Sequence, residues 1–88
     1  MKSLIWTKKF TKAASKFIDS NPEKTDQFKK VIRQLEKDVF EPSLKTHKLK
    51  GKMLGMYGCS ISFSYRIVFM ISDESVILLN IGDHEEVY

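Results

Sequence analysis

The chain has 88 residues, of which 42% are hydrophobic and 11% aromatic. This length fits one small domain spanning residues 1–88, and the apolar content is too high for a disordered chain. A single cysteine, Cys59, excludes a fold held together by disulfides, and we expect it to be a small buried residue. No signal peptide and no bilayer-spanning stretch is predicted, so we expect a cytoplasmic protein that does not bind membranes.

The positive charge is concentrated in the first part of the chain. The net charge is +4, but residues 1–52 hold 14 lysine and arginine residues against six acidic ones. Residues 53–88 hold only one such cation, Arg66, against five acidic residues. A basic surface suits RNA or an acidic protein partner. The solvated faces of helices carry the same kind of charge, and for the helical part we favour this second interpretation.

The beginning of the chain predicts a strand followed by a helix. Residues 3–6 are a short apolar stretch that suits a strand, and Thr7 can cap the helix after it. Apolar residues then recur at helical spacing from Phe10 to Ile18, with lysines on the other side.

A second helix is predicted after a short joint. Asn21 is a suitable N-cap and Pro22 a suitable first helical residue. A second apolar stripe runs from Phe28 to Val39, and Glu41-Pro42 is expected to end the helix, because the residue before a proline avoids helical angles. Together the two amphipathic helices predict an antiparallel helical hairpin.

The second half of the chain predicts strands. Residues 43–55 form a lysine-rich loop, and residues 61–71 alternate at period two, with a turn expected near Phe63-Ser64. Residues 72–75 are a clearer turn, and residues 76–81 are typical of a buried strand that ends at Gly82.

This order predicts an α+β fold of two layers. It consists of an N-terminal strand, the helical hairpin and a three-stranded antiparallel meander, with the helices packed on one face of a four-stranded sheet. Arg66 and the serines near it have the opposite parity to Ile67 and Phe69. We therefore expect Arg66 to face outward from the open side of the sheet.

Four segments carry a resemblance to a known family. They are His47–Gly51, which fits a K-L-x-G loop, then Tyr57, then Ser64–Phe69, which contains Y-R-I-V-F, and finally Ile81–Tyr88, which fits I-G-x-H-x-x-V-Y. In this order and at these spacings the chain resembles the RelE/ParE superfamily of bacterial toxins over essentially its whole length. The tail is most similar to the YafQ branch.

The resemblance implies a function as well as a fold. It implies a type II toxin–antitoxin system with a cognate antitoxin as partner. For RelE-like and YafQ-like members it implies an endoribonuclease that cleaves mRNA in the ribosomal A site without a metal or other cofactor. ParE-like members share the fold but inhibit DNA gyrase, so a gyrase inhibitor is the alternative. A third possibility is a binding domain whose catalytic activity has decayed.

The resemblance also implies site residues. His84 and Tyr88 are similar to the catalytic histidine and terminal aromatic residue of the YafQ branch, and His47 to its loop histidine. Arg66 resembles the arginine that steadies the phosphate in RelE. The positions of a further histidine and an aspartate of that branch hold Ser60 and Ser64 here, and these serines cannot perform acid–base chemistry.

The chemistry of RNA cleavage fits these residue types. Histidine is the natural acid or base near neutral pH, and arginine holds a phosphate with its planar, always charged fork. His84 is the first choice for the acid or base, and His47 is either a second such group or an ordinary loop histidine. Arg66 either binds phosphate or pairs with a carboxylate such as Asp83.

Other residues have two interpretations each. Tyr88 either stacks on a base and contacts the phosphate, or belongs to a disordered end. Trp6 and Tyr57 are expected to be core or partly buried aromatic residues rather than base-stacking ones. Four lysines of the loop either bind the RNA backbone or are solvated, and three of them would share one face if the segment is extended. These four are Lys45, Lys48, Lys50 and Lys52.

Overall fold

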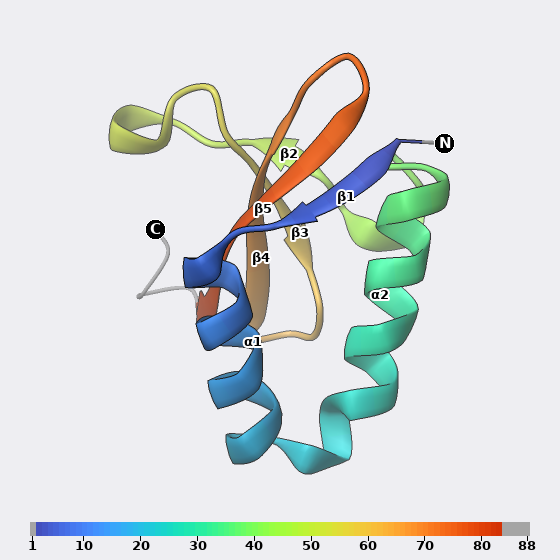
Figure 1. Ribbon diagram of the computed structural model, residues 1–88, viewed down its shortest axis with the longest axis vertical. Coiled ribbons are helices and arrows are strands. Elements are labelled where there is room, and N and C mark those ends of the chain that lie inside the picture. The colour runs from blue at the N-terminus through green and yellow to red at the C-terminus, as the bar shows by residue number, and fades with distance from the viewer. Residues whose placement is uncertain (1, 84–88) are drawn as a thin grey trace.

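The computed structural model describes residues 2–83, apart from the side chain of Lys52. It consists of five strands and two α-helices, joined in part by short 3-10 helices (Figure 1). The strands are β1 (Ser3–Trp6), β2 (His47–Lys48), β3 (Tyr57–Ser60), β4 (Tyr65–Ile71) and β5 (Ser75–Asp83). The helices are α1 (Lys8–Ser20) and α2 (Thr25–Lys37), and the 3-10 helices are η1 (Pro22–Lys24), η2 (Pro42–Leu44) and η3 (Gly51–Met53).

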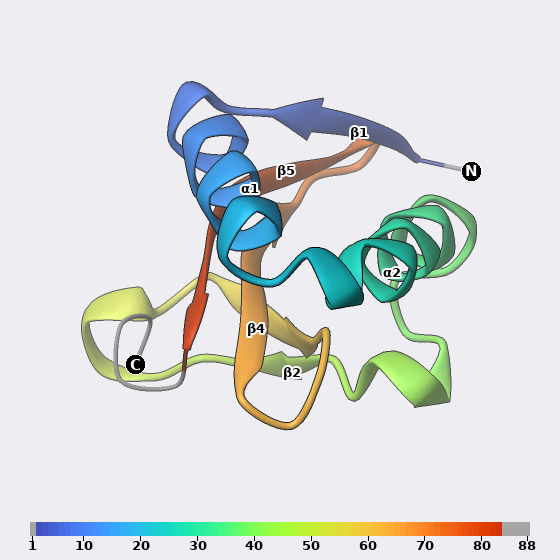
Figure 2. The same ribbon diagram turned by 90° about the horizontal axis from the view of Figure 1, so that it is seen from below.

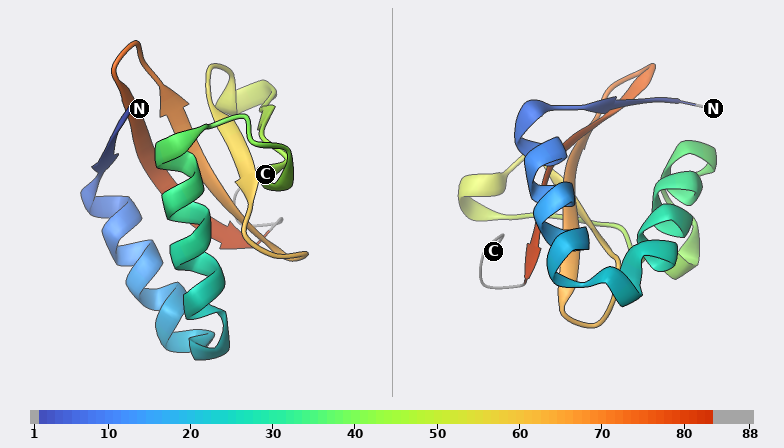
Figure 3. Two further views of the ribbon diagram at one scale, coloured as in Figure 1. Left: turned by 90° about the vertical axis from the view of Figure 1, so that its right-hand side faces the viewer. Right: turned by 60° about the horizontal axis from the view of Figure 1, so that its bottom comes forward.

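The strands form one mixed sheet in the order β1-β5-β4-β3-β2. The meander β3-β4-β5 is antiparallel, as predicted, and β1 pairs in parallel with β5. Both helices lie side by side over one face of this sheet (Figure 3), which confirms the α+β fold and the helical hairpin.

The predicted number of four strands is wrong, because β2 adds a fifth strand at the edge of the sheet. His47 and Lys48 pair with Gly58 and Tyr57, inside the segment that was predicted to be a loop. A strand of two residues is too short to produce a recognisable alternation of apolar and polar side chains. Its pairing is set by the neighbouring strand β3 and not by its own sequence.

Helix α1 begins where the sequence predicts. The side-chain oxygen of Thr7 accepts a hydrogen bond from the amide of Phe10 at 3.1 Å, and its hydroxyl donates to the carbonyl of Leu78 at 2.7 Å. Thr7 therefore caps the helix and also ties it to β5. Asn21 occupies the N-cap position before Pro22, as predicted, but it precedes η1 and its side chain makes no cap hydrogen bond there. Its side-chain amide instead donates to the carbonyl of Phe17 and closes the end of α1.

Helix α2 ends four residues earlier than the expected boundary at Glu41-Pro42. Its last residue is Lys37, and Asp38 already has an extended backbone. The carboxylate of Asp38 accepts a hydrogen bond from the amide of Phe40 at 3.0 Å, an alternative to continuing the helix that aspartate often provides. Val39 remains buried although it lies beyond the helix.

The main core lies between the two helices and one face of the sheet. Aromatic side chains occupy much of it, with 6.4 Å between the ring centroids of Phe10 and Phe28 and 6.1 Å between those of Phe17 and Phe28. The exposed ring of Trp6 covers Phe10 from outside, edge to face. The helices contribute most of the larger side chains, and β4 and β5 supply the opposite wall. The buried residues of this core are Phe10, Ala14, Phe17, Phe28, Val31, Leu35, Val39, Leu44, Cys59, Ile61, Ile67, Phe69, Val76, Leu78 and Ile81. Within residues 2–83 neither helix is long and apolar enough to cross a membrane.

Strand β5 contains an irregularity and runs further than predicted. Val68 pairs with Asn80 and Phe69 with Leu78, so Leu79 is an extra residue on β5, as in a β-bulge. The bulge explains why the run of apolar residues does not alternate strictly. Gly82 does not end the strand, because it is still paired with Arg66.

We expect the change Thr7→Ala to destabilise the fold by about 1–2 kcal/mol, because it removes both the helix cap and the bond to Leu78. The change Thr7→Ser keeps the hydroxyl and should cost clearly less. Urea unfolding measures both values. Equal losses for the two variants would show that the hydroxyl does not stabilise this junction.

Candidate functional site

Arg66 lies on the face of the sheet opposite to the helices. Its neighbour Ile67 is completely buried in the main core, and successive side chains of a strand point to opposite faces. Arg66 pairs with Ser60 on β3 and with Gly82 on β5, and directly paired residues share a face. The prediction that Arg66 faces away from the helices is therefore confirmed.

His47 lies on the same face, two strands away. It pairs with Gly58, which in turn pairs with Val68 on β4, two residues from Arg66. With about 4.8 Å between strands and about 3.4 Å per residue, the Cα atoms of His47 and Arg66 would be about 12 Å apart in a flat sheet. Their side chains are long enough to approach one phosphodiester group from two sides.

The ring of His47 is oriented by its own loop. Its Nδ1 atom lies 3.1 Å from the backbone carbonyl oxygen of Lys45. A carbonyl oxygen can only accept a hydrogen bond, so Nδ1 carries the proton of the neutral ring. Nε2 is then the nitrogen that accepts a proton, and the same nitrogen donates it when the ring is charged.

The lysines of the loop do not form one extended row. The backbone is extended at Lys50 but turns at Gly51, where φ is +68°, and residues 51–53 form η3. Lys48 is paired with Tyr57, so it projects to the other side of β2 from His47. Lys45, Lys48 and Lys50 are all exposed, and of Lys52 only the backbone is described.

A second, smaller apolar cluster supports this loop from the open face. Leu49 and Val68 are buried in it, and Met53, Met56 and Leu79 pack against them. Figure 2 shows α2 on one side of β4 and the segment around η3 on the other. The lysine-rich loop is therefore attached to the same face that carries His47 and Arg66.

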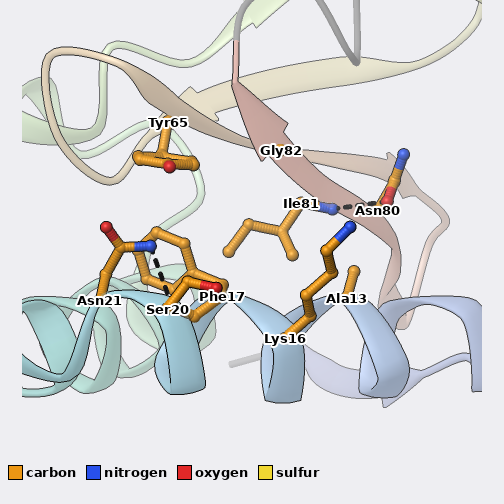
Figure 4. Close-up of a pocket in the computed structure, with 9 residues that line it drawn as sticks. All are labelled: Ala13, Lys16, Phe17, Ser20, Asn21, Tyr65, Asn80, Ile81 and Gly82. Atoms are coloured by element: carbon orange, nitrogen blue, oxygen red, sulfur yellow. Dashed lines mark hydrogen bonds between the residues drawn. The ribbon is translucent and has the colours of Figure 1, made fainter.

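A pocket of about 220 Å³ lies on the helical side, between α1 and the ends of β4 and β5. Phe17, Tyr65 and Ile81 form its apolar walls, and Lys16 extends from α1 towards β5 (Figure 4). The side chain of Asn80 points away from α1 in this view, in agreement with its pairing to Val68. The pocket is thus separated from the open face by the sheet itself.

Cys59 behaves as a core residue, as predicted. It is completely buried, and this burial raises the pKa of its thiol from 9.0 to about 12, against smaller opposing effects of a backbone hydrogen bond from Ile67 and the positive charge of Arg66. A thiol that stays neutral is a poor nucleophile. Within residues 2–83 no group of three or more histidine, cysteine, aspartate or glutamate residues could hold a metal ion.

The structure describes only some of the remaining predicted site residues. His84 and Tyr88 lie outside the described residues. Tyr57 is a partly buried aromatic residue, as expected, and its ring stacks on Phe69 with 6.0 Å between centroids. The same expectation is wrong for Trp6, which is 44% exposed because it lies on the edge strand β1. Ser64 lies in the exposed turn between β3 and β4, and only Ser60 shares the row of Arg66.

Sequence reasoning did not single out two glycines that lie in the rows of His47 and Arg66. Gly58 lies between His47 and Val68, and Gly82 lies beside Arg66. Both are buried, so they belong to the interior of the sheet and not to its accessible surface. Glycines inside a strand pattern are the signal from which these two positions could have been found.

The fold indicates the class of the protein, because solved bacterial toxins have the same fold. A toxin from Helicobacter pylori, solved as a copper-bound mutant, is 29% identical, with a TM-score of 0.82 and all of both chains covered. YafQ from E. coli strain BL21(DE3) is 12% identical, with a TM-score of 0.84 and coverage of 100% of this chain and 99% of YafQ.

A second structure of YafQ, solved in complex with DinJ, is also similar to this chain. In the E. coli DinJ-YafQ toxin-antitoxin complex it is 13% identical, with a TM-score of 0.81 and coverage of 99% of this chain and 97% of YafQ. The family model for YafQ, a bacterial toxin of type II toxin-antitoxin systems, matches residues 2–88. The chain therefore belongs to the YafQ family of type II toxins. No curated protein gives a significant match.

We expect the thiol of Cys59 to be almost unreactive towards DTNB at pH 8 in the folded protein and to react fully in urea. Folding raises the pKa of this thiol, so the folded protein keeps the proton up to a higher pH than the unfolded chain does. The resulting contribution to the free energy of unfolding is complete below pH 9 and is lost as the pH rises towards 12. The matched control is the double variant Cys59→Ala, Ser64→Cys, whose exposed thiol should react at once. Equally fast reaction of the native protein would contradict the burial of Cys59.

Proposed function

We propose that this toxin is a ribosome-dependent endoribonuclease that cleaves mRNA by metal-free acid–base catalysis. The observation that carries the proposal is the presence of Arg66 and His47 on one face of the sheet, opposite to the helices. Membership of the YafQ family supports the same activity, because the resemblance to the YafQ branch implies an endoribonuclease.

The reaction needs three groups around one phosphodiester. A base takes the proton of the 2′-hydroxyl, whose oxygen attacks phosphorus, and an acid gives a proton to the departing 5′-oxygen. A cation stabilises the negative charge that builds up on the phosphate oxygens. Arg66 is the residue we assign to the phosphate, because its guanidinium remains charged and binds two oxygens at once.

We assign the proton transfers to His47 and His84, and a supporting contact to Tyr88. Asp83, the last described residue of β5, pairs with Tyr65, which is the neighbour of Arg66. His84 follows Asp83 directly in the sequence, and its assignment rests on the resemblance of the tail to the YafQ branch. Tyr88 would stack on a base or donate its hydroxyl to the phosphate.

The lysines of the loop supply a further attraction for RNA. We propose that Lys45, Lys50 and Lys52 contact its phosphate backbone, because a cluster of cations on one loop binds a polyanion independently of sequence. Lys48 was expected to join them, but it projects to the other side of β2 from His47, so we leave it out of this contact. The mRNA partner would be presented in the ribosomal A site. The small apolar cluster under Leu49 holds this loop beside the reactive residues.

We also propose a cognate antitoxin as a protein partner. E. coli YafQ has been solved in a toxin–antitoxin complex with DinJ. The outer surface of α1 carries four exposed lysines, which would favour an acidic partner. They are Lys8, Lys9, Lys12 and Lys16.

The nuclease is tested by primer extension on a reporter mRNA after induction of the toxin. The wild type should produce new 5′ ends inside the translated region and none in an untranslated transcript. Arg66→Ala should lower cleavage about 100-fold or more, because the charge on the phosphate loses its partner. Arg66→Lys should be intermediate, since it keeps the charge but not the fork.

Arg33→Ala is the matched control, because Arg33 is an exposed arginine on α2, on the helical side. It should cleave like the wild type. Growth arrest with intact mRNA would refute the nuclease and point to gyrase inhibition. Intact mRNA with normal growth would indicate a binding domain without catalytic activity.

A further inference from the structure

Lys45 has an unusual backbone conformation. It is the one non-glycine residue with positive φ among residues 2–83, with φ at 53° and ψ at 40°. This left-handed conformation is unfavourable for a residue with a Cβ atom, and it persists only where the surrounding structure enforces it. Such positions cluster at functional sites.

Contacts on both sides of Lys45 hold it in place. Its own amide donates to the carbonyl of Pro42 at 3.2 Å, and the preceding Leu44 is only 2% exposed, within the main core. The hydroxyl of the following residue, Thr46, donates to the carbonyl of Val39 at 2.6 Å. The chain therefore has to reverse its direction at Lys45, between η2 and β2.

This reversal directs the carbonyl group of Lys45 towards His47. The carbonyl oxygen lies 3.1 Å from Nδ1, and the hydrogen bond that one ring nitrogen makes determines which nitrogen carries the proton. His47 itself is fixed at the other end by its pairing with Gly58 in the sheet. The ring is thus held between a strand and a strained turn.

We propose that Lys45 is a positioning residue for His47. Its left-handed backbone turns its carbonyl oxygen towards Nδ1 and makes Nε2 the nitrogen that exchanges a proton with RNA. This role rests on the proposed nuclease function, and it is the same whether His47 acts as acid or as base. It requires the backbone conformation of Lys45 and not its ammonium group.

Two pairs of substitutions separate the conformation from the charge. Lys45→Gly and Lys45→Asn remove the ammonium group but tolerate positive φ. Lys45→Val removes the same charge and strongly disfavours positive φ, because its side chain is β-branched. Lys45→Ala disfavours it more mildly and serves if the valine variant does not fold, which the amide spectrum of each variant shows.

The tautomer of His47 is read from imidazole ¹⁵N shifts of the purified full-length chain at pH 8, where an imidazole is neutral. His84→Gln assigns the two sets of signals. We expect the proton on Nδ1 in the wild type and in the glycine and asparagine variants, and a shift towards Nε2 in the valine variant. Cleavage by the valine variant should be roughly tenfold slower than by the glycine variant.

A proton on Nε2 of the wild type would overturn the proposal, as would equal tautomers and equal cleavage in the valine and glycine variants. If the wild type cleaves no mRNA, the nuclease function fails. The tautomers then still decide whether Lys45 orients the ring. If cleavage occurs but is unchanged in His47→Ala, the nuclease stands and the role of Lys45 in it is refuted.

Discussion

Ile67 and Phe69 are completely buried against the two helices, and this forces Arg66 and Val68 onto the opposite face of β4. The other strands take their orientation from β4 through pairing. One face of the sheet therefore becomes the main core, while the other carries Arg66 beside the smaller cluster around Leu49 and Val68. In a chain of this size there is only enough apolar material for one large core, so the second face is covered only in part.

The lysine-rich segment is held at two points, although its sequence predicts a loop. Leu44, which precedes the turn at Lys45, is buried in the main core, and Leu49 is buried in the smaller cluster on the open face. Between these two points the chain passes through Lys45 and His47 at the edge of the sheet. A histidine at the edge is thereby held more firmly than an ordinary loop would hold it, which is what proton transfer requires.

The sequence was sufficient to predict the elements that have a strong period. The helical stripe from Phe10 to Ile18 predicted the first helix. The alternation around Arg66 predicted the meander and the face of the sheet on which the arginine lies. The two-residue strand that carries His47 and the bulge at Leu79 could not be predicted, because both depend on pairing with distant residues. For the same reason the sequence did not reveal that His47 pairs with Gly58.

We expect RNA to bind to the open face of the sheet. This binding can be tested by recording the amide spectrum of the protein while an oligoribonucleotide with 2′-O-methyl groups is added, which cannot be cleaved because its 2′-oxygens carry no proton. Amide shifts are expected at Gly58, Arg66 and Gly82, and none on the exposed side of α2. Shifts confined to the lysines of α1 and α2, with the open face unchanged, would contradict it.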